Sequence, residues 1–171
     1  MKLLNKYDAQ LARHAKETQQ MNLPLLSWDF HLNNLNELSK TFNDIFAIKK
    51  ITNKLTVSVD LIKEFKDNSK VIVITSPDLE IEFASSNILE MTGYLPSELI
   101  ENSPKMFQGE NTDDIVSRTI RNKVNRKQSF EAVLLNYRKD NSEYNCQIKG
   151  YPIFNKKGAL IKYAAVEQEV A

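Results

Sequence analysis

The chain has 171 residues, enough for one domain with an additional segment and enough to bury a complete hydrophobic core. Its 23 basic and 22 acidic side chains nearly cancel, which argues against a nucleic acid or an anionic membrane as a partner. The single cysteine excludes an internal disulfide, and no apolar run has the length of a signal peptide or a membrane span. These features predict a cytoplasmic protein.

Residues 1–68 are expected to form an N-terminal helical region. Apolar side chains recur every three or four positions within residues 1–20, 28–49 and 54–66, and Pro24 separates the first helix from the second. The apolar stripe of the second helix consists of Trp28, Leu32, Leu35, Phe42, Ile45 and Phe46. Such a stripe needs a partner, which is the first helix, the sheet of the next domain or the same helix of a second copy.

Residues 69–171 are expected to form an α+β domain, because β-branched and alternating runs bound by turn residues are interrupted by helical segments. The expected strands are 71–75, 80–84, 132–138, 143–154 and 160–168. A short helix is expected to begin after Ser85 or Ser86 as its N-cap, and a longer helix spans 113–126. This order predicts a five-stranded antiparallel sheet with short helices on one face, preceded by the N-terminal helical extension.

The segment between the second strand and the longer helix, residues 90–113, predicts several very short helices separated by turns. Pro96 suits the first position of a helix, and Pro104 favours an extended Ser103 before it. Gly109 allows a sharp exit towards the next helix. Because isolated short helices are marginal in water, this segment must be held by packing, and the wall of a cavity is the expected place.

The two-residue period of the strands predicts which side chains face those short helices. In the strand 143–154, Tyr144, Cys146 and Ile148 share the more apolar face, so this face is expected to point inward. In the last strand, the inward set is expected to contain Glu167. For the strand 132–138 the pattern leaves both faces open.

Six short sequences occur in order between residues 71 and 168: IVIT, EFASSN, EMTGY, PKMFQGENTD, LLNYRKDN and KYAAVEQ. Together they resemble a PAS domain, and within that family they are most like the light-oxygen-voltage (LOV) flavoproteins. The resemblance covers about the last three-fifths of the chain. It implies a curved antiparallel sheet whose inner face holds a ligand, which in the LOV group is FMN.

The resemblance also assigns roles around the flavin phosphate and the reactive thiol. LOV domains carry N-C-R-F-L-Q where this chain has S-P-K-M-F-Q, so Pro104 stands at the position of the cysteine that attacks flavin in light. Pro104 has no nucleophile, and thiol–flavin photochemistry is excluded at this position. The two phosphate-side arginines of the family correspond to Lys105, which is cationic but lacks a bidentate fork, and to Arg121.

Four further positions correspond to the polar residues of the LOV pocket. Gln108 and Asn136 keep the amide side chains of the family. Cys146 replaces an amide, which leaves a flavin carbonyl under-satisfied at a cost of about 1–3 kcal/mol. Glu167 replaces the terminal glutamine, and its ionised form would repel a carbonyl oxygen unless burial kept it protonated.

Each of these residues also has a purely structural interpretation. Cys146 is then a small buried hydrophobe, Asn136 pairs with neighbouring backbone, and Glu167 turns outward near the chain end. The basic side chains of the predicted helix 113–126 then form a solvated face. His14 and His31 lie on separate helices without a carboxylate cluster, so no metal site is expected.

We therefore expect a non-enzymatic PAS-family module that relays a signal or mediates a protein–protein interaction. The expected partners are a second copy bound through the N-terminal helices, a signalling protein such as a kinase, and a small-molecule ligand. The alternative is an FMN-binding photo- or redox-sensor that lacks the adduct-forming cysteine. An enzyme is not expected, since the sequence offers no acid–base pair around the pocket.

Overall fold

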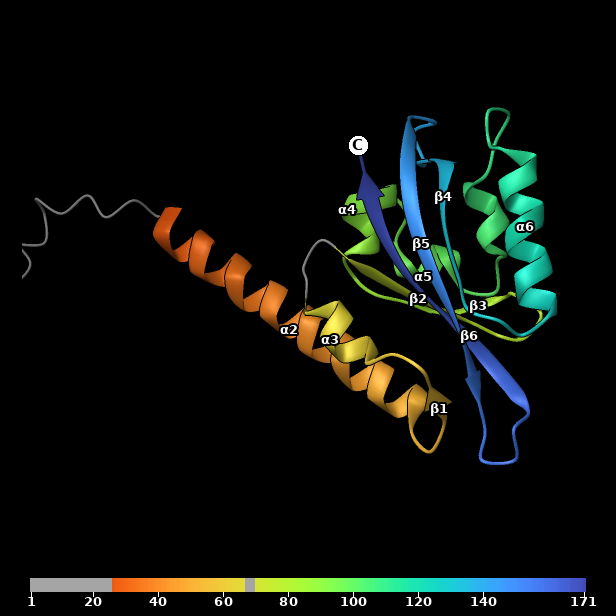
Figure 1. Ribbon diagram of the computed structural model, residues 1–171. Helices are drawn as coiled ribbons and strands as arrows, with labels where there is room; N and C mark the ends of the chain where they lie inside the picture. The colour runs from red at the N-terminus through yellow and green to blue at the C-terminus, as the bar shows by residue number, and fades with distance from the viewer. Residues whose placement is uncertain (1–25, 67–69) are drawn as a thin grey trace, which may run out of the picture. The chain divides into compact units, whose positions relative to one another are not determined.

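The computed structural model describes residues 26–66 and 70–171, and these residues fall into two units that divide between Ser39 and Lys40. In the described part, one antiparallel sheet of six strands carries short helices (Figure 1). The helices are α2 (Leu26–Thr52), α3 (Leu61–Phe65), α4 (Ile88–Thr92), α5 (Pro96–Leu99), the 3₁₀ helix η1 (Pro104–Phe107) and α6 (Asp114–Asn125). The strands are β1 (Thr56–Val57), β2 (Val71–Thr75), β3 (Ile81–Ala84), β4 (Phe130–Tyr137), β5 (Glu143–Phe154) and β6 (Leu160–Val170).

The sheet runs in the order β1-β5-β6-β2-β3, and β4 also pairs with β5. The α+β prediction is confirmed, and β1 extends the expected five strands to six. The predicted strands 71–75 and 143–154 match β2 and β5, and β3 begins one residue later than predicted. β4 begins two residues and ends one residue before the predicted bounds, and β6 ends two residues after them. The predicted helix over residues 1–20 lies outside the described residues, and the division of the chain at residue 68 stays a prediction.

The two faces of the sheet are covered by different helices. We call the face towards α4, α5 and η1 the inner face, and the opposite face, against α3 and the second half of α2, the outer face (Figure 1). The inner cluster of buried side chains contains Val71, Val73, Ile81, Ala84, Ile88, Met91, Leu99, Phe107, Tyr144 and Cys146. The outer cluster contains Ile48, Leu61, Phe65, Ile72, Ile74, Ile153, Ala164 and Val166. Both faces of β2 are therefore buried, as its unbroken β-branched sequence requires.

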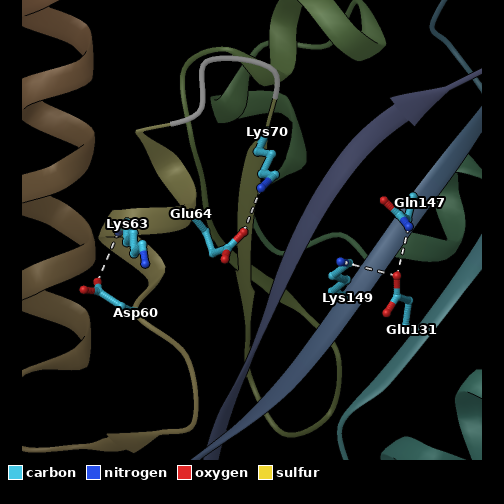
Figure 2. A network of polar contacts seen from close by, with 7 residues as sticks. All are labelled: Asp60, Lys63, Glu64, Lys70, Glu131, Gln147 and Lys149. Atoms are coloured by element: carbon cyan, nitrogen blue, oxygen red, sulfur yellow. Dashed lines mark hydrogen bonds and ion pairs between the residues drawn. The ribbon is translucent and has the colours of Figure 1, made fainter.

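The predicted helix over residues 54–66 is wrong in its first half. Thr56–Val57 pairs with β5 as β1, and only Leu61–Phe65 is helical. The helix starts there because the Asp60 carboxylate accepts hydrogen bonds from the backbone N–H groups of Ile62 and Lys63, both at 3.1 Å. Figure 2 shows the bond from Lys63.

Side-chain ion pairs and hydrogen bonds reinforce the sheet near its surface. Lys70 at the start of β2 pairs with Glu64 of α3 at 2.9 Å (Figure 2). On β4, Glu131 accepts a hydrogen bond from Gln147 at 2.9 Å and pairs with Lys149 at 3.3 Å, both on β5. Exposed pairs of this kind contribute little to stability, typically about 0–1 kcal/mol each. The sheet therefore owes its stability to the two buried clusters.

Asp44 of α2 joins this helix to the segment that precedes α4. Its carboxylate accepts two hydrogen bonds from Ser86, one from the backbone N–H at 2.8 Å and one from the hydroxyl at 2.7 Å. The prediction that Ser85 or Ser86 caps α4 is wrong, because Asn87 occupies the N-cap position and makes no side-chain cap bond. The Ser85 hydroxyl instead accepts from the N–H of Ile72 on β2 at 2.9 Å.

The apolar residues of α2 divide between two sides of the helix. Ile48 is buried in the outer cluster and Ile45 packs against it. Phe42 and Phe46, in contrast, are 72% and 65% exposed. The first half of α2 carries three further exposed leucines, Leu32, Leu35 and Leu38. The apolar residues predicted to form one stripe therefore lie on two sides of α2, one buried and one exposed.

Candidate functional site

One cavity of about 120 Å³ lies between the inner face of the sheet and the helices η1 and α6. At roughly 10–15 Å³ for each water-sized probe, this volume holds several small atoms or waters. Its polar lining includes Thr75, Lys105, Gln108, Arg121, Asn136 and Glu167. Five of the six site residues predicted from the sequence are therefore brought together in one wall.

The chain builds this wall from turns and strands that the sequence places locally. The Ser103 hydroxyl accepts from the N–H of Lys105 at 3.4 Å, and this extended N-cap residue starts η1 at Pro104. Asp113 caps α6 by accepting from the N–H of Ile115 at 2.7 Å, as its acid-rich start predicts. These two short elements carry the lining residues Lys105 and Arg121.

Two cationic side chains line the mouth of the cavity, since both are exposed. They are Lys105 on η1 and Arg121 on α6. Neither makes an ion pair with any residue in 26–66 or 70–171. An anionic group at the mouth would therefore meet two available donors without displacing a protein carboxylate.

The inner end of the cavity is polar, although it is buried. Thr75, Asn136 and Glu167 are each no more than 4% exposed. The Oγ1 atom of Thr75 and the Oδ1 atom of Asn136 have no hydrogen-bond partner in the described part of the chain. Because more than about nine in ten buried polar groups are paired in folded proteins, these two atoms indicate a place for a polar ligand or for water.

Gln108, the residue after η1, also lines the cavity. Its Oε1 atom accepts a hydrogen bond from the Ser117 hydroxyl of α6 at 3.2 Å. This bond joins the end of η1 to α6 and leaves the amide N–H₂ donors of Gln108 for other partners.

Glu167 on β6 lies between apolar strand neighbours. Its register partners are Ile148 on β5 and Val71 on β2. Burial among them raises the pKa of the Glu167 carboxyl to about 7, and the contact with Cys146 opposes this shift. The side chain therefore carries a proton over much of the acidic and neutral range.

Cys146 lies in the inner cluster beside Glu167 and does not line the cavity. Its Sγ atom is 3.9 Å from Oε2 of Glu167. Burial, together with the neighbouring Glu167 charge, raises the pKa of the thiol well above its ordinary value. The only cysteine of the chain is thus a protonated, fully buried thiol, which is unreactive as a nucleophile.

The sequence interpretation missed Thr75 as a candidate site residue. The signal was the two-residue period of β2, because Thr75 follows Val71 and Val73 on the inner face. It also left the orientation of β4 open. In the structure Leu134 and Asn136 of β4 line the cavity.

Phe130 and Gly150 close the cavity beside α6. They are register partners on β4 and β5, and a methyl group at position 150 would overlap the Phe130 ring. The ring therefore lies directly against the backbone of β5. An aromatic ring over a glycine in the opposite strand compensates for the missing side chain.

An FMN cofactor, which the resemblance implies, fits some of these residues. Lys105 and Arg121 suit its phosphate, and the unpartnered Asn136 amide oxygen suits an N–H of the ring. Glu167 suits a ring carbonyl only while it is protonated. Cys146 offers no amide, and Pro104 in the wall has no nucleophile. The polar groups therefore match a flavin in part, but the cavity of about 120 Å³ is smaller than the roughly 300–1,000 Å³ usual for ligand pockets, so FMN would enter only with a displacement of the wall.

The described residues contain no group of three or more side chains able to hold a metal ion. Within 26–66 and 70–171, no helix has the combination of length and hydropathy needed to cross a membrane.

Comparison with known proteins identifies relatives of the segment that forms the sheet. A family model described as a PAS domain matches residues 68–170. Phototropin-2 of Oryza sativa subsp. japonica is 33% identical over 112 residues, which cover 66% of this chain and 12% of the relative. A blue-light photoreceptor of Listeria monocytogenes is 29% identical over 113 residues, 64% of this chain and 44% of the relative. The chain thus spans less than half the length of either relative.

Solved structures give the same result. A light-oxygen-voltage domain studied with a flavin analogue aligns with a TM-score of 0.61 at 29% identity, over 67% of this chain and 87% of that chain. The light-state structure of the Aureochrome1 LOV domain aligns with a TM-score of 0.59 at 27% identity, over 66% of this chain and 90% of that one.

Proposed function

The chain belongs to the PAS domain family, and from this premise we propose that it is a non-enzymatic sensory module that passes the state of its cavity to its N-terminal helices. The observation that carries this proposal is the alternation of side chains along β6. Tyr163, Ala165 and Glu167 line the cavity, Val166 is buried in the outer cluster, and Ala164 belongs to both.

Successive side chains of a strand point to opposite faces of the sheet, so a displacement of β6 moves side chains on both faces. In the outer cluster, Ala164 and Val166 lie with Ile48 of α2 and with Leu61 and Phe65 of α3. Close-packed interiors transmit strain of this kind. A ligand that presses on the inner face of β6 would therefore alter the packing of these helices.

Hydrogen exchange tests this relay without requiring a known ligand. Ala165→Val adds volume on the cavity face of β6 and imitates an occupant. We expect it to change amide exchange in residues 44–66 several-fold. Ala132→Val is the matched control, because Ala132 shares the inner face but lies on β4. Unchanged exchange in residues 44–66 of the Ala165→Val protein, with exchange altered elsewhere, would contradict the relay.

We further propose that the signal reaches a second copy of the chain through α2. Phe42 and Phe46 leave an exposed apolar side on this helix, and exposed apolar rows commonly mark interfaces. A signalling protein such as a kinase is the proposed recipient of the assembled state.

The second candidate function is that of an FMN-binding photo- or redox-sensor without the adduct-forming cysteine. It is favoured by the two unpaired cations at the mouth and the unpartnered polar atoms at the inner end. When bound, a flavin supplies redox chemistry and blue-light absorption. In this proposal Lys105 and Arg121 hold the phosphate, Gln108, Asn136 and Glu167 orient the ring edge, and Cys146 supports Glu167 from the core.

The FMN proposal is tested by reconstitution. Protein mixed with FMN is expected to become yellow, and illumination is expected to leave no covalent bond between protein and flavin, as measured by mass spectrometry. Lys105→Gln with Arg121→Gln should weaken FMN binding about tenfold or more, since charged hydrogen bonds are lost. Arg118→Gln is the control on α6, because Arg118 bonds to the Asp114 carbonyl and does not line the cavity. Colourless protein after reconstitution would rule out this candidate.

A further inference from the structure

Glu167 is the most unusual group in the cavity wall. It lines the cavity, it is only 4% exposed, and it makes no ion pair with any described residue. Its strand neighbours, Ile148 and Val71, are apolar. A buried carboxylate without a cation is strongly disfavoured, so this position selects the neutral acid.

The surrounding charges do not reverse this preference. The titratable and charged side chains that share the inner cluster or the cavity wall with Glu167 are Cys146 and Tyr144 on β5, Tyr163 on β6, Lys105 on η1 and Arg121 on α6, and Glu169 lies farther along β6. Burial raises the pKa of both the Cys146 thiol and the Tyr144 phenol, so these groups stay neutral. Glu169 is paired with Arg138 at 2.6 Å. The two cations are exposed at the mouth, where solvent screens them.

A neutral carboxylic acid differs from the amide side chains of the cavity in one respect. Its O–H group is a donor only while the proton is bound, whereas the N–H₂ group of an amide is a donor at every pH. After loss of the proton, the same atoms are acceptors and carry a charge. The hydrogen bond that position 167 offers a ligand therefore depends on proton occupancy.

We propose that Glu167 is a specificity-determining residue that binds a ligand's carbonyl oxygen or unprotonated ring nitrogen as a neutral acid, so that above neutral pH each ligand enters together with one proton from solvent. The inference rests on the proposed function, in which the cavity holds a ligand. The chemical class is a heteroaromatic ring that presents an acceptor to Glu167 and an N–H donor to the unpartnered Oδ1 of Asn136. Flavins belong to this class, and so do smaller rings with a cyclic imide or amide edge.

The test compares FMN affinity for the wild-type protein and for Glu167→Gln across pH. The phosphate of FMN titrates equally in both experiments, so the ratio of the two dissociation constants isolates residue 167. With a pKa of about 7 for Glu167, the dissociation constant of the wild-type protein divided by that of Glu167→Gln should rise about thirtyfold between pH 5.5 and about 8.5. The glutamine side chain keeps its N–H donor at every pH. The FMN affinity of the Glu167→Gln protein should therefore change with pH only through ionisation of the FMN phosphate.

A second measurement needs no variant. Calorimetric titration of wild-type protein with FMN, in buffers of different ionisation enthalpy, counts the protons taken up on binding. At about pH 8.5 the expected uptake is close to one proton, since nearly all free Glu167 is then ionised. Binding with no proton uptake at this pH would overturn the proposal, whether or not Glu167→Gln folds.

The outcomes separate this inference from the function on which it rests. If both proteins bind FMN with the same pH profile, the role of Glu167 is wrong and the cavity remains a flavin site. If neither protein binds FMN at any pH, the flavin candidate itself fails, and the inference fails with it for this ring. If the FMN affinity of the wild-type protein falls relative to that of Glu167→Gln above neutral pH, and their ratio is constant at lower pH, both the role of Glu167 and the flavin site are supported.

Discussion

Glu167 makes the stability of the fold depend on pH in an unusual direction. An ordinary glutamate titrates near 4.5, whereas the buried Glu167 carboxyl titrates at about 7. Between these values the unfolded chain has lost the proton that the folded chain retains. The stabilising contribution is therefore complete below 4.5 and is lost as the pH rises through 7.

We predict that wild-type protein loses about 3 kcal/mol of unfolding free energy across this window relative to Glu167→Gln. Urea unfolding of both proteins at several pH values measures the difference. Exposed carboxylates such as Glu98 and Asp140, whose pKa values are lowered by their hydrogen bonds, act in the opposite direction and are common to both proteins. Parallel stability curves for the two proteins would contradict the prediction.

Residue 150 has no side chain, and the Phe130 ring occupies the space that a side chain would take. Gly150→Ala should destabilise the protein by about 1–3 kcal/mol, since the new methyl group overlaps the Phe130 ring. The control is the same substitution in a Phe130→Ala background, where the overlap is absent and the added cost should largely disappear. Chemical denaturation of the four proteins measures this coupling. Strictly additive effects would show that the ring is not the cause.

The candidate site could be predicted from the sequence only in part. Period two placed Cys146, Ile148 and Glu167 on the inner face, and the family resemblance supplied Asn136. Two facts depend on three-dimensional packing and could not be read from the chain. Cys146 is screened from the cavity, and Thr75 is left without a hydrogen-bond partner. Both follow from which side chains of neighbouring strands fill the intervening space.

At the scale of elements, α2 is joined to the start of α4 by the carboxylate of Asp44. We predict that Asp44→Ala lowers the unfolding free energy by about 1–3 kcal/mol, because the Ser86 N–H loses its acceptor. Ser86→Ala removes one of the two bonds and should cost less. In the double variant the two effects should not add, since both act on one contact. Additive losses in urea unfolding would show that the two residues act independently.

The elements whose first residues are determined by nearby residues were predicted well. Pro96 and Asp113 start α5 and α6 through local geometry and local hydrogen bonds, which the chain carries within a few residues. Thr56–Val57 was taken for helix because its pairing partners, Phe154 and Ile153, lie about a hundred residues away. Local periodicity has no access to such a contact.

At the scale of the whole molecule, the exposed side of α2 should control assembly. We predict that the wild-type chain is a dimer at micromolar concentration, and that Phe42→Ser with Phe46→Ser makes it a monomer because the apolar contact is lost. Size-exclusion chromatography with light scattering measures the mass. Ile115→Ser is the matched control, since Ile115 is 69% exposed on α6 and lies outside the proposed interface. A monomeric wild-type chain would contradict the prediction.

The sequence pattern could not divide the α2 stripe into its two sides. Ile45 packs against the outer cluster while the neighbouring Phe46 is exposed, although both belong to one apolar row in the sequence. The division follows the contacts of the second half of α2, where Ile48 is buried in the outer cluster and Asp44 accepts a hydrogen bond from Ser86. Only the assembled fold determines it.

β6 is one strand with two buried faces, one towards the cavity and one towards the outer cluster. A substitution on β6 that is selected for a new ligand will therefore also change assembly. A library randomised at β6 should return variants in which both traits have changed together. A library at Leu134 and Asn136 should return altered ligand preference alone, because the other side of β4 at these positions does not belong to the outer cluster. Anyone redesigning the specificity of this protein would therefore begin on β4.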